Sequence, residues 1–134
     1  MRYMPAEPAL ILNGLRAAEG FFARCFADTD GRVERLFVAH VDDEARCLHV
    51  SHHDGGEVSA DFPLKAIIAD AVRHGSAGIV LAHNHTSGDA RPSEADCRTT
   101  RRLASAAEAL DCTILDHLIF AGGKRTSMRR LGYL

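Results

Sequence analysis

The chain has 134 residues, of which 46% are apolar and 25% are charged, as expected for one globular domain with a single core. Its formal net charge of −2 gives no electrostatic argument for binding nucleic acid or a membrane, and no apolar run is long enough to cross a bilayer. The dispersed cysteines (Cys25, Cys47, Cys97 and Cys112) exclude a C-x-x-C centre and predict reduced thiols in a cytoplasmic protein.

An N-terminal helix is predicted to begin at Pro8, because proline suits a first helical turn and apolar residues then recur at helical spacing. A turn at residues 28–31 ends it. Residues 1–31 are therefore predicted to form a helical extension, and residues 32–134 the main domain. The apolar face of the helix is expected to cover a sheet or to join two chains, which leaves the oligomeric state open.

The main domain alternates strands and helices. Residues 33–41 and 46–52 predict an antiparallel hairpin, and residues 63–74 a helix that Gly75 ends. The uninterrupted apolar residues 77–82 are typical of a strand buried on both faces. A loop, a helix over 93–110, a strand over 112–121 and a short strand over 125–128 follow. This order predicts an α/β fold with a mixed central sheet flanked by helices.

The strand over 77–82 runs directly into His83-Asn84-His85. Residues two apart on an extended chain point to the same side, so both imidazoles can face one ion, with Asn84 pointing away. Asp96, in the first turn of the next helix, can add an oxygen ligand. Two histidines and one aspartate leave a fourth zinc position open, which is typical of catalytic sites. We therefore predict that the chain binds Zn²⁺ and activates a water for hydrolysis.

These residues also have structural interpretations. A single histidine at a strand end is usually an ordinary polar residue, but two at this spacing need a common reason to face one way. Ser93 and Asp96 resemble a capping box that opens a helix. Capping and metal binding are compatible, because a cap would hold Asp96 toward the strand end.

Hydrolysis also requires a base, and a carboxylate outside the ligand set would serve. Spacing alone does not decide between Glu34, Glu44, Glu57 and Asp61. Glu34 is the best physical candidate, because it begins the apolar strand that would lie beside the metal-bearing strand.

The spacing His83-x-His85, seven residues, Ser93, two residues, Asp96 resembles the JAMM (MPN+, JAB) metalloprotease motif. The flanking segments are similar to the RadC branch of that family: residues 79–85, 87–89, 115–119 and 127–132. The resemblance implies a cytidine-deaminase-like three-layer fold and zinc held by the two histidines and Asp96. It also implies that Ser93 stabilises the oxyanion, and that Glu34, at the start of the first strand, is the base.

Several features depart from the family pattern. Thr86 stands where RadC-like sequences usually have proline, and Lys65-Ala66 stand where Arg-Glu is frequent. Residues 1–31 are also too short for the helix-hairpin-helix DNA-binding module of RadC proteins. A peptide or protein substrate is therefore expected ahead of a DNA-repair or other nucleic-acid role, which the charge does not support. A non-catalytic interaction domain is the third hypothesis. The pattern fits neither an HNH nuclease nor a cytidine deaminase.

Overall fold

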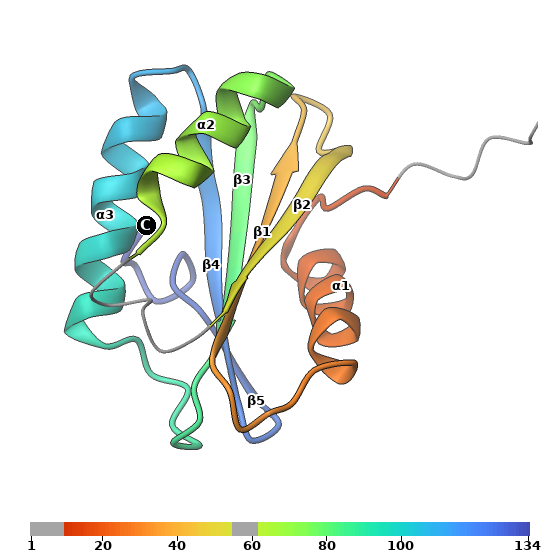
Figure 1. Ribbon diagram of the computed structural model, residues 1–134, viewed down its shortest axis with the longest axis vertical. Coiled ribbons are helices and arrows are strands. Elements are labelled where there is room, and N and C mark those ends of the chain that lie inside the picture. Colours follow the sequence, from red (N-terminus) through yellow and green to blue (C-terminus); the bar gives the residue numbers. More distant parts are fainter. Residues whose placement is uncertain (1–9, 55–61) are drawn as a thin grey trace, which may run out of the picture.

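The computed structural model describes residues 10–54 and 62–134. In this part of the chain a five-stranded sheet lies between α1 on one face and α2 and α3 on the other (Figure 1). The elements are α1 (Leu15–Ala27), β1 (Arg35–Val41), β2 (Cys47–Asp54), α2 (Leu64–His74), β3 (Gly78–Asn84), α3 (Glu94–Glu108), β4 (Thr113–Ala121) and β5 (Lys124–Ser127). The predicted three-layer α/β fold is confirmed.

The sheet has the order β2-β1-β3-β4-β5, so β3 is the central strand. It pairs antiparallel with β1 and parallel with β4, which makes the sheet mixed. Every residue of β3 is buried, as its continuous apolar sequence predicted. The predicted hairpin is confirmed in β1 and β2, which pair antiparallel.

Each face of the sheet has its own apolar core. On one face, Leu36, Ile79 and Leu81 pack with Ile67 of α2 and Leu103 of α3. The core of the other face is formed with α1, through these residues: Ala18, Phe22, Phe37, Ala39, Val80, Ala82 and Leu118. Helix α1 therefore covers the sheet, one of the two roles expected of it.

The predicted start of the first helix is wrong. Helix α1 begins at Leu15, and Gly14 before it has a φ of 113°, which a glycine adopts most easily. The preceding residues are extended instead: Leu12 N–H donates to the Ala45 carbonyl at 2.9 Å, and Cys47 N–H donates to the Leu10 carbonyl at 2.7 Å. Backbone pairing with the start of β2 outweighs the helical spacing of these apolar residues.

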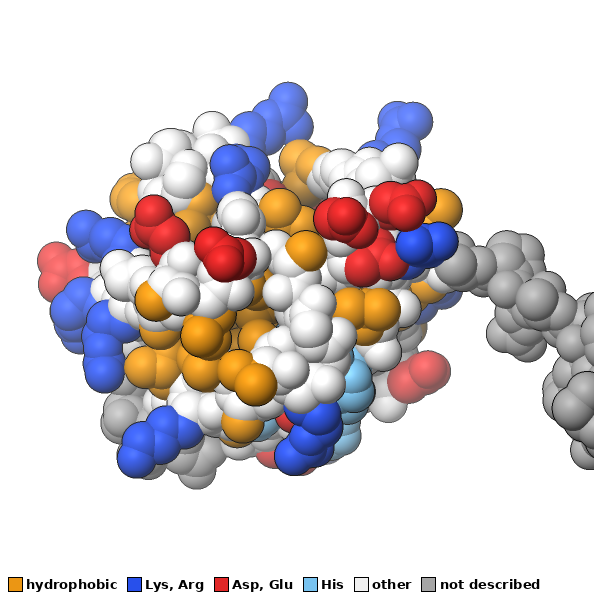
Figure 2. All heavy atoms as spheres, turned by 90° about the horizontal axis from the view of Figure 1, so that it is seen from above, with side chains coloured by type: hydrophobic (Ala, Val, Ile, Leu, Met, Phe, Trp, Pro, Cys, Tyr) orange, Lys and Arg blue, Asp and Glu red, His pale blue; other side chains and the backbone are white. Residues whose placement is uncertain are grey.

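Figure 2 shows the end of the molecule at which β3 begins, remote from His85. Basic and acidic side chains are interspersed there around an area of apolar side chains, and histidine side chains reach the surface. Among the described residues, no helix is both long and apolar enough to span a bilayer.

Candidate metal and catalytic site

The carboxyl end of β3 meets the first turn of α3, and there the two predicted histidines and Asp96 come together. His85 Nε2 lies 3.0 Å from Asp96 Oδ2, and His83 Nε2 lies 3.4 Å from Asp96 Oδ1. Ligand atoms about 2.0–2.2 Å from a tetrahedral zinc ion are separated by about 3.3–3.6 Å. The spacing of these three side chains therefore fits one ion.

The cluster is shielded from water. The side chains of His83, His85 and Asp96 are 1%, 15% and 6% exposed. Nε2 of His83 is a buried nitrogen without a hydrogen-bond partner. An unpartnered nitrogen beside a carboxylate is costly in a buried site, and a bound cation would satisfy both groups. The donor set and its burial fit Zn²⁺.

A backbone carbonyl orients His85. Its Nδ1 lies 2.8 Å from the carbonyl oxygen of Asp89, which can only accept, so Nδ1 carries the proton and donates it. Nε2 is then the nitrogen that faces Asp96. The hydrogen bond to Asp96 raises the pKa of His85, because the carboxylate stabilises the protonated ring. A metal ion bound between the two side chains would compete with a proton for Nε2.

A buried chain of hydrogen bonds supports His83. Its Nδ1 lies 2.7 Å from Nε2 of His117, whose Nδ1 lies 2.7 Å from Oγ1 of Thr100. When Nδ1 of His83 carries the proton, each group in turn donates to the next, ending at Sδ of Met128, 3.9 Å from the threonine hydroxyl. Burial keeps the pKa of His117 well below its usual range, so this ring is neutral and can accept. The arrangement leaves Nε2 of His83 free for an ion.

The capping box at the start of α3 is present. Ser93 Oγ accepts from the Asp96 N–H at 3.0 Å, and the Ser93 N–H donates to Asp96 Oδ2 at 2.8 Å. Burial alone would raise the pKa of the Asp96 carboxyl, but the imidazoles of His83 and His85 beside it outweigh burial and hold the pKa well below its usual range. Asp96 is therefore an anion that the helix start holds toward β3.

Asn84 has a structural role between the two histidines. It points away from them, as predicted, and fixes the backbone on both sides of Glu34: Oδ1 accepts from the Arg35 N–H at 2.7 Å, and Nδ2 donates to the Val33 carbonyl at 3.0 Å. Glu34 is consequently held at the entrance to β1, beside the end of β3 that carries the histidines.

Glu34 is the one candidate base that the described structure places near the cluster. Its Oε2 lies 3.5 Å from Oγ1 of Thr86, the residue after His85. Glu44 instead pairs with Arg46 at 3.0 Å, in the turn after Val41, at the opposite end of β1. Glu57 and Asp61 lie outside the described residues.

Two hollows flank the cluster. One, of about 320 Å³, is lined in part by His85, Phe120 and Lys124. The other, of about 420 Å³, includes Ser93 and Tyr133 in its lining. One hollow thus borders His85 and the other borders Ser93, the residue that caps the helix carrying Asp96, and a substrate segment could enter either of them.

Sequence reasoning did not assign roles to His117, Thr100 or Asn84. His117 was noted only within the family-like segment 115–119, and Asn84 only as a spacer that points away. Their functions depend on partners 34, 17 and 49–51 residues distant in the chain, so only the pairing of the strands and the packing of α3 on the sheet reveal them.

Comparison with known families agrees with this geometry. Residues 13–133, nearly the whole chain, match the model of the RadC-like JAB domain. The chain belongs to the RadC-like JAB family. The match begins before α1, so it includes the helix that covers the second face of the sheet.

Several RadC-family relatives are similar over long segments. A UPF0758 protein of Bordetella petrii is 44% identical over 132 residues, which cover 96% of this chain and 59% of that protein. A UPF0758 protein of Cellvibrio japonicus is 34% identical over 137 residues, covering 96% and 54% of the two chains. A UPF0758 protein of Methanospirillum hungatei is 46% identical to this chain over a shorter segment of 70 residues, which covers 52% of this chain and 31% of that protein. The chain spans at most 59% of the length of each of these three relatives.

Proposed function

We propose that this RadC-like JAB domain is a zinc-dependent hydrolase that cleaves a peptide or isopeptide bond. The observation that carries the proposal is the convergence of Nε2 of His83 and Nε2 of His85 on the two oxygens of Asp96. Both Nδ1 atoms have protein partners, and both Nε2 atoms face the same anionic carboxylate. This arrangement of two imidazoles and one carboxylate is the ligand chemistry of a catalytic zinc site.

Each protein group then has a distinct task. Zinc, when bound, would supply Lewis acidity toward a water molecule and a substrate carbonyl. Glu34 would take a proton from the attacking water and return it to the leaving nitrogen. The oxygen of Ser93 already accepts from Asp96 N–H, so its hydroxyl proton remains available to the carbonyl oxygen as charge develops there.

The test separates metal binding from catalysis with two variants. Asp96→Ala is expected to lose the zinc of this site, measured by metal analysis of purified protein. Glu34→Gln is expected to keep that zinc and to lower hydrolysis about 10²–10⁴-fold, because it removes only the proton acceptor. Hydrolysis is measured on a mixture of fluorogenic peptides and an isopeptide-linked conjugate.

Glu44→Gln is the matched control, since it removes a carboxylate at the opposite end of β1. It should keep both zinc and activity. Zinc bound with equal stoichiometry at this site in Asp96→Ala would contradict the ligand set. Equal activity in Glu34→Gln and Glu44→Gln would contradict the assigned base, and a purely interacting domain would show no turnover in any variant.

The charge distribution gives no support for nucleic-acid binding by the face of the molecule shown in Figure 2. Sequence-independent binding needs basic side chains clustered on one surface. On the face shown in Figure 2, acidic and basic side chains are interspersed instead, and the whole chain has a net charge of −2.

A further inference from the structure

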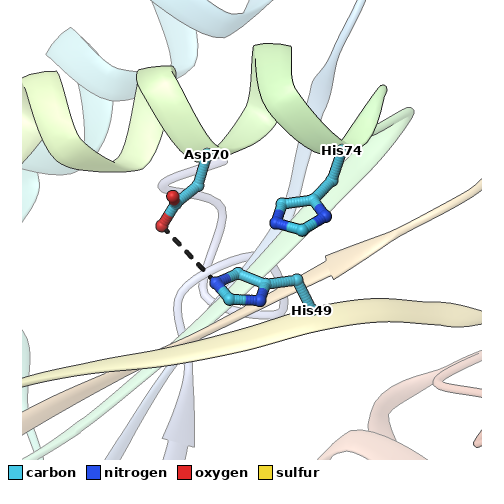
Figure 3. Close-up of side chains that lie close together, drawn as sticks. All are labelled: His49, Asp70 and His74. Carbon is cyan, nitrogen blue, oxygen red and sulfur yellow. Dashed lines mark ion pairs between the residues drawn. The ribbon is translucent and has the colours of Figure 1, made fainter.

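A second group of metal-ligating side chains lies on the same sheet face, toward the other end of β1. It consists of His49 from β2 and of Asp70 and His74 from α2 (Figure 3). One ligand atom from each lies within 4.8 Å of the other two. His40, the cross-strand partner of His49, lies four residues along β1 from Leu36, which pairs with His83. The two groups are thus separated by about 13 Å of strand.

We propose that His49, Asp70 and His74 form a second binding site for a late first-row divalent cation, with Zn²⁺ as the probe. Two imidazoles and one carboxylate suit such ions better than Mg²⁺ or Ca²⁺, which take oxygen ligands. The proposal is independent of the hydrolytic site, because the two sites share no residue.

Local structure brings the three side chains together. Asp70 and His74 are four residues apart on α2, so they lie on one side of the helix. His49 is on the side of β2 that faces α2, because its neighbours Leu48 and Val50 point the other way and are exposed. His49 Nε2 lies 3.7 Å from Asp70 Oδ2 (Figure 3). The site would therefore join the edge strand of the sheet to α2.

The group is accessible and needs only a small adjustment. The side chains of His49 and Asp70 are 34% and 18% exposed. The rings of His49 and His74 are stacked, with centroids 4.2 Å apart and planes 13° from parallel. Both rings must tilt about their last side-chain torsion for their lone pairs to converge, and that torsion has a broad energy minimum in histidine.

A buried histidine beneath the group supports the assignment. His40 is fully buried, its ring centroid lies 5.8 Å from that of His49 and 6.4 Å from that of His74, and its Nδ1 lies 2.8 Å from Ser76 Oγ. Its Nε2 has no hydrogen-bond partner. Among the described residues, the side-chain atoms of this kind are Arg35 Nε, His40 Nε2 and His83 Nε2. Each of the two histidine–aspartate groups thus has an unpartnered imidazole nitrogen in or beside it.

The experiment uses the full chain carrying Asp96→Ala, which removes the first site. After equilibrium dialysis against ZnCl₂, this protein is expected to retain one zinc ion per chain. Adding His74→Gln, or in a separate variant Asp70→Asn, should abolish that binding. Adding His52→Gln should not, since His52 is on the same strand but points away from α2 and is exposed. Zinc should also raise the thermal unfolding midpoint of the Asp96→Ala protein, with or without His52→Gln. It should not raise the midpoint of the proteins that carry His74→Gln or Asp70→Asn in addition to Asp96→Ala.

The proposal is overturned if the folded Asp96→Ala protein binds no zinc. It is equally overturned if His74→Gln and Asp70→Asn retain as much zinc as His52→Gln. In the chain with Asp96 intact, His74→Gln should lower the zinc content by one and leave hydrolysis unchanged. Zinc lost through His74→Gln in a chain that never hydrolyses a substrate would uphold this site and refute the proposed function.

Discussion

His83 can offer Nε2 to an ion only while its proton stays on Nδ1, and His117 is the group that accepts from that position. His117→Leu keeps the buried volume roughly constant but removes the acceptor. The substitution is expected to weaken zinc binding at the first site about 10–100-fold, because ligands depend on such outer partners for orientation. Competition with a fluorescent zinc chelator measures the change in affinity.

His117→Gln provides the conservative comparison, since its amide can accept from His83 and donate to Thr100. It should recover part of the zinc affinity. If both variants bind zinc as tightly as the unmodified chain and are merely less stable, His117 is a core residue without influence on the metal.

At the residue scale, the sequence predicted the ligands but not their support. His83, His85, Ser93 and Asp96 lie within 14 consecutive positions, so spacing alone suggested that they converge. The partners of His83 and of Glu34 come from other strands and from α3, and their approach depends on packing that no local pattern encodes.

At the element scale, Ser93 at the start of α3 has two roles, because it caps the helix and is the proposed hydrogen-bond donor to the substrate carbonyl. Ser93→Ala removes the Oγ that accepts from Asp96 N–H and should cost about 1 kcal/mol of unfolding free energy, whereas Ser93→Gly costs only a few tenths. Both variants lack the hydroxyl proton assigned to the carbonyl oxygen. We therefore expect Ser93→Gly to unfold at nearly the original denaturant concentration and yet to hydrolyse about 10²–10³-fold more slowly.

Urea unfolding and the hydrolysis assay, run on the same preparations, check this expectation. Activity that falls only in proportion to the loss of stability would assign Ser93 to capping alone. Ser93→Thr serves as the control, because it keeps both the acceptor oxygen and the hydroxyl proton.

The elements themselves were predictable where local signals agree with packing. Gly75 ends α2 in a left-handed conformation, and Ser93 begins α3, both as the sequence indicated. The start of α1 was not predictable, because Leu10 and Leu12 form backbone hydrogen bonds with residues more than 30 positions away. The helical spacing of apolar residues does not reveal whether a distant segment offers hydrogen-bond partners to their backbone.

At the scale of the whole molecule, burial of His40 links stability to pH. Burial lowers the pKa of His40 from 6.5 to about 4; Asp70 opposes this shift, and His49 and His74 add to it. Between these pH values the unfolded chain binds a proton that the folded chain excludes, so stability rises with pH. This contribution is complete above pH 6.5 and is lost as the pH falls toward 4.

Acidification of the metal-free protein from pH 6.5 to pH 4 should therefore cost about 2–3 kcal/mol through this residue. His40→Leu removes the titrating group from the same buried position. The number of protons that the chain takes up on unfolding, which sets the slope of its stability against pH, should therefore fall by up to one in that range. Urea unfolding in EDTA at several pH values measures both slopes, and EDTA prevents metal at either site from adding its own pH dependence. Equal slopes would mean that the folded protein takes up the proton at His40 as readily as the unfolded chain does. That result would require the layer between β1 and α2 to open to water without loss of the fold.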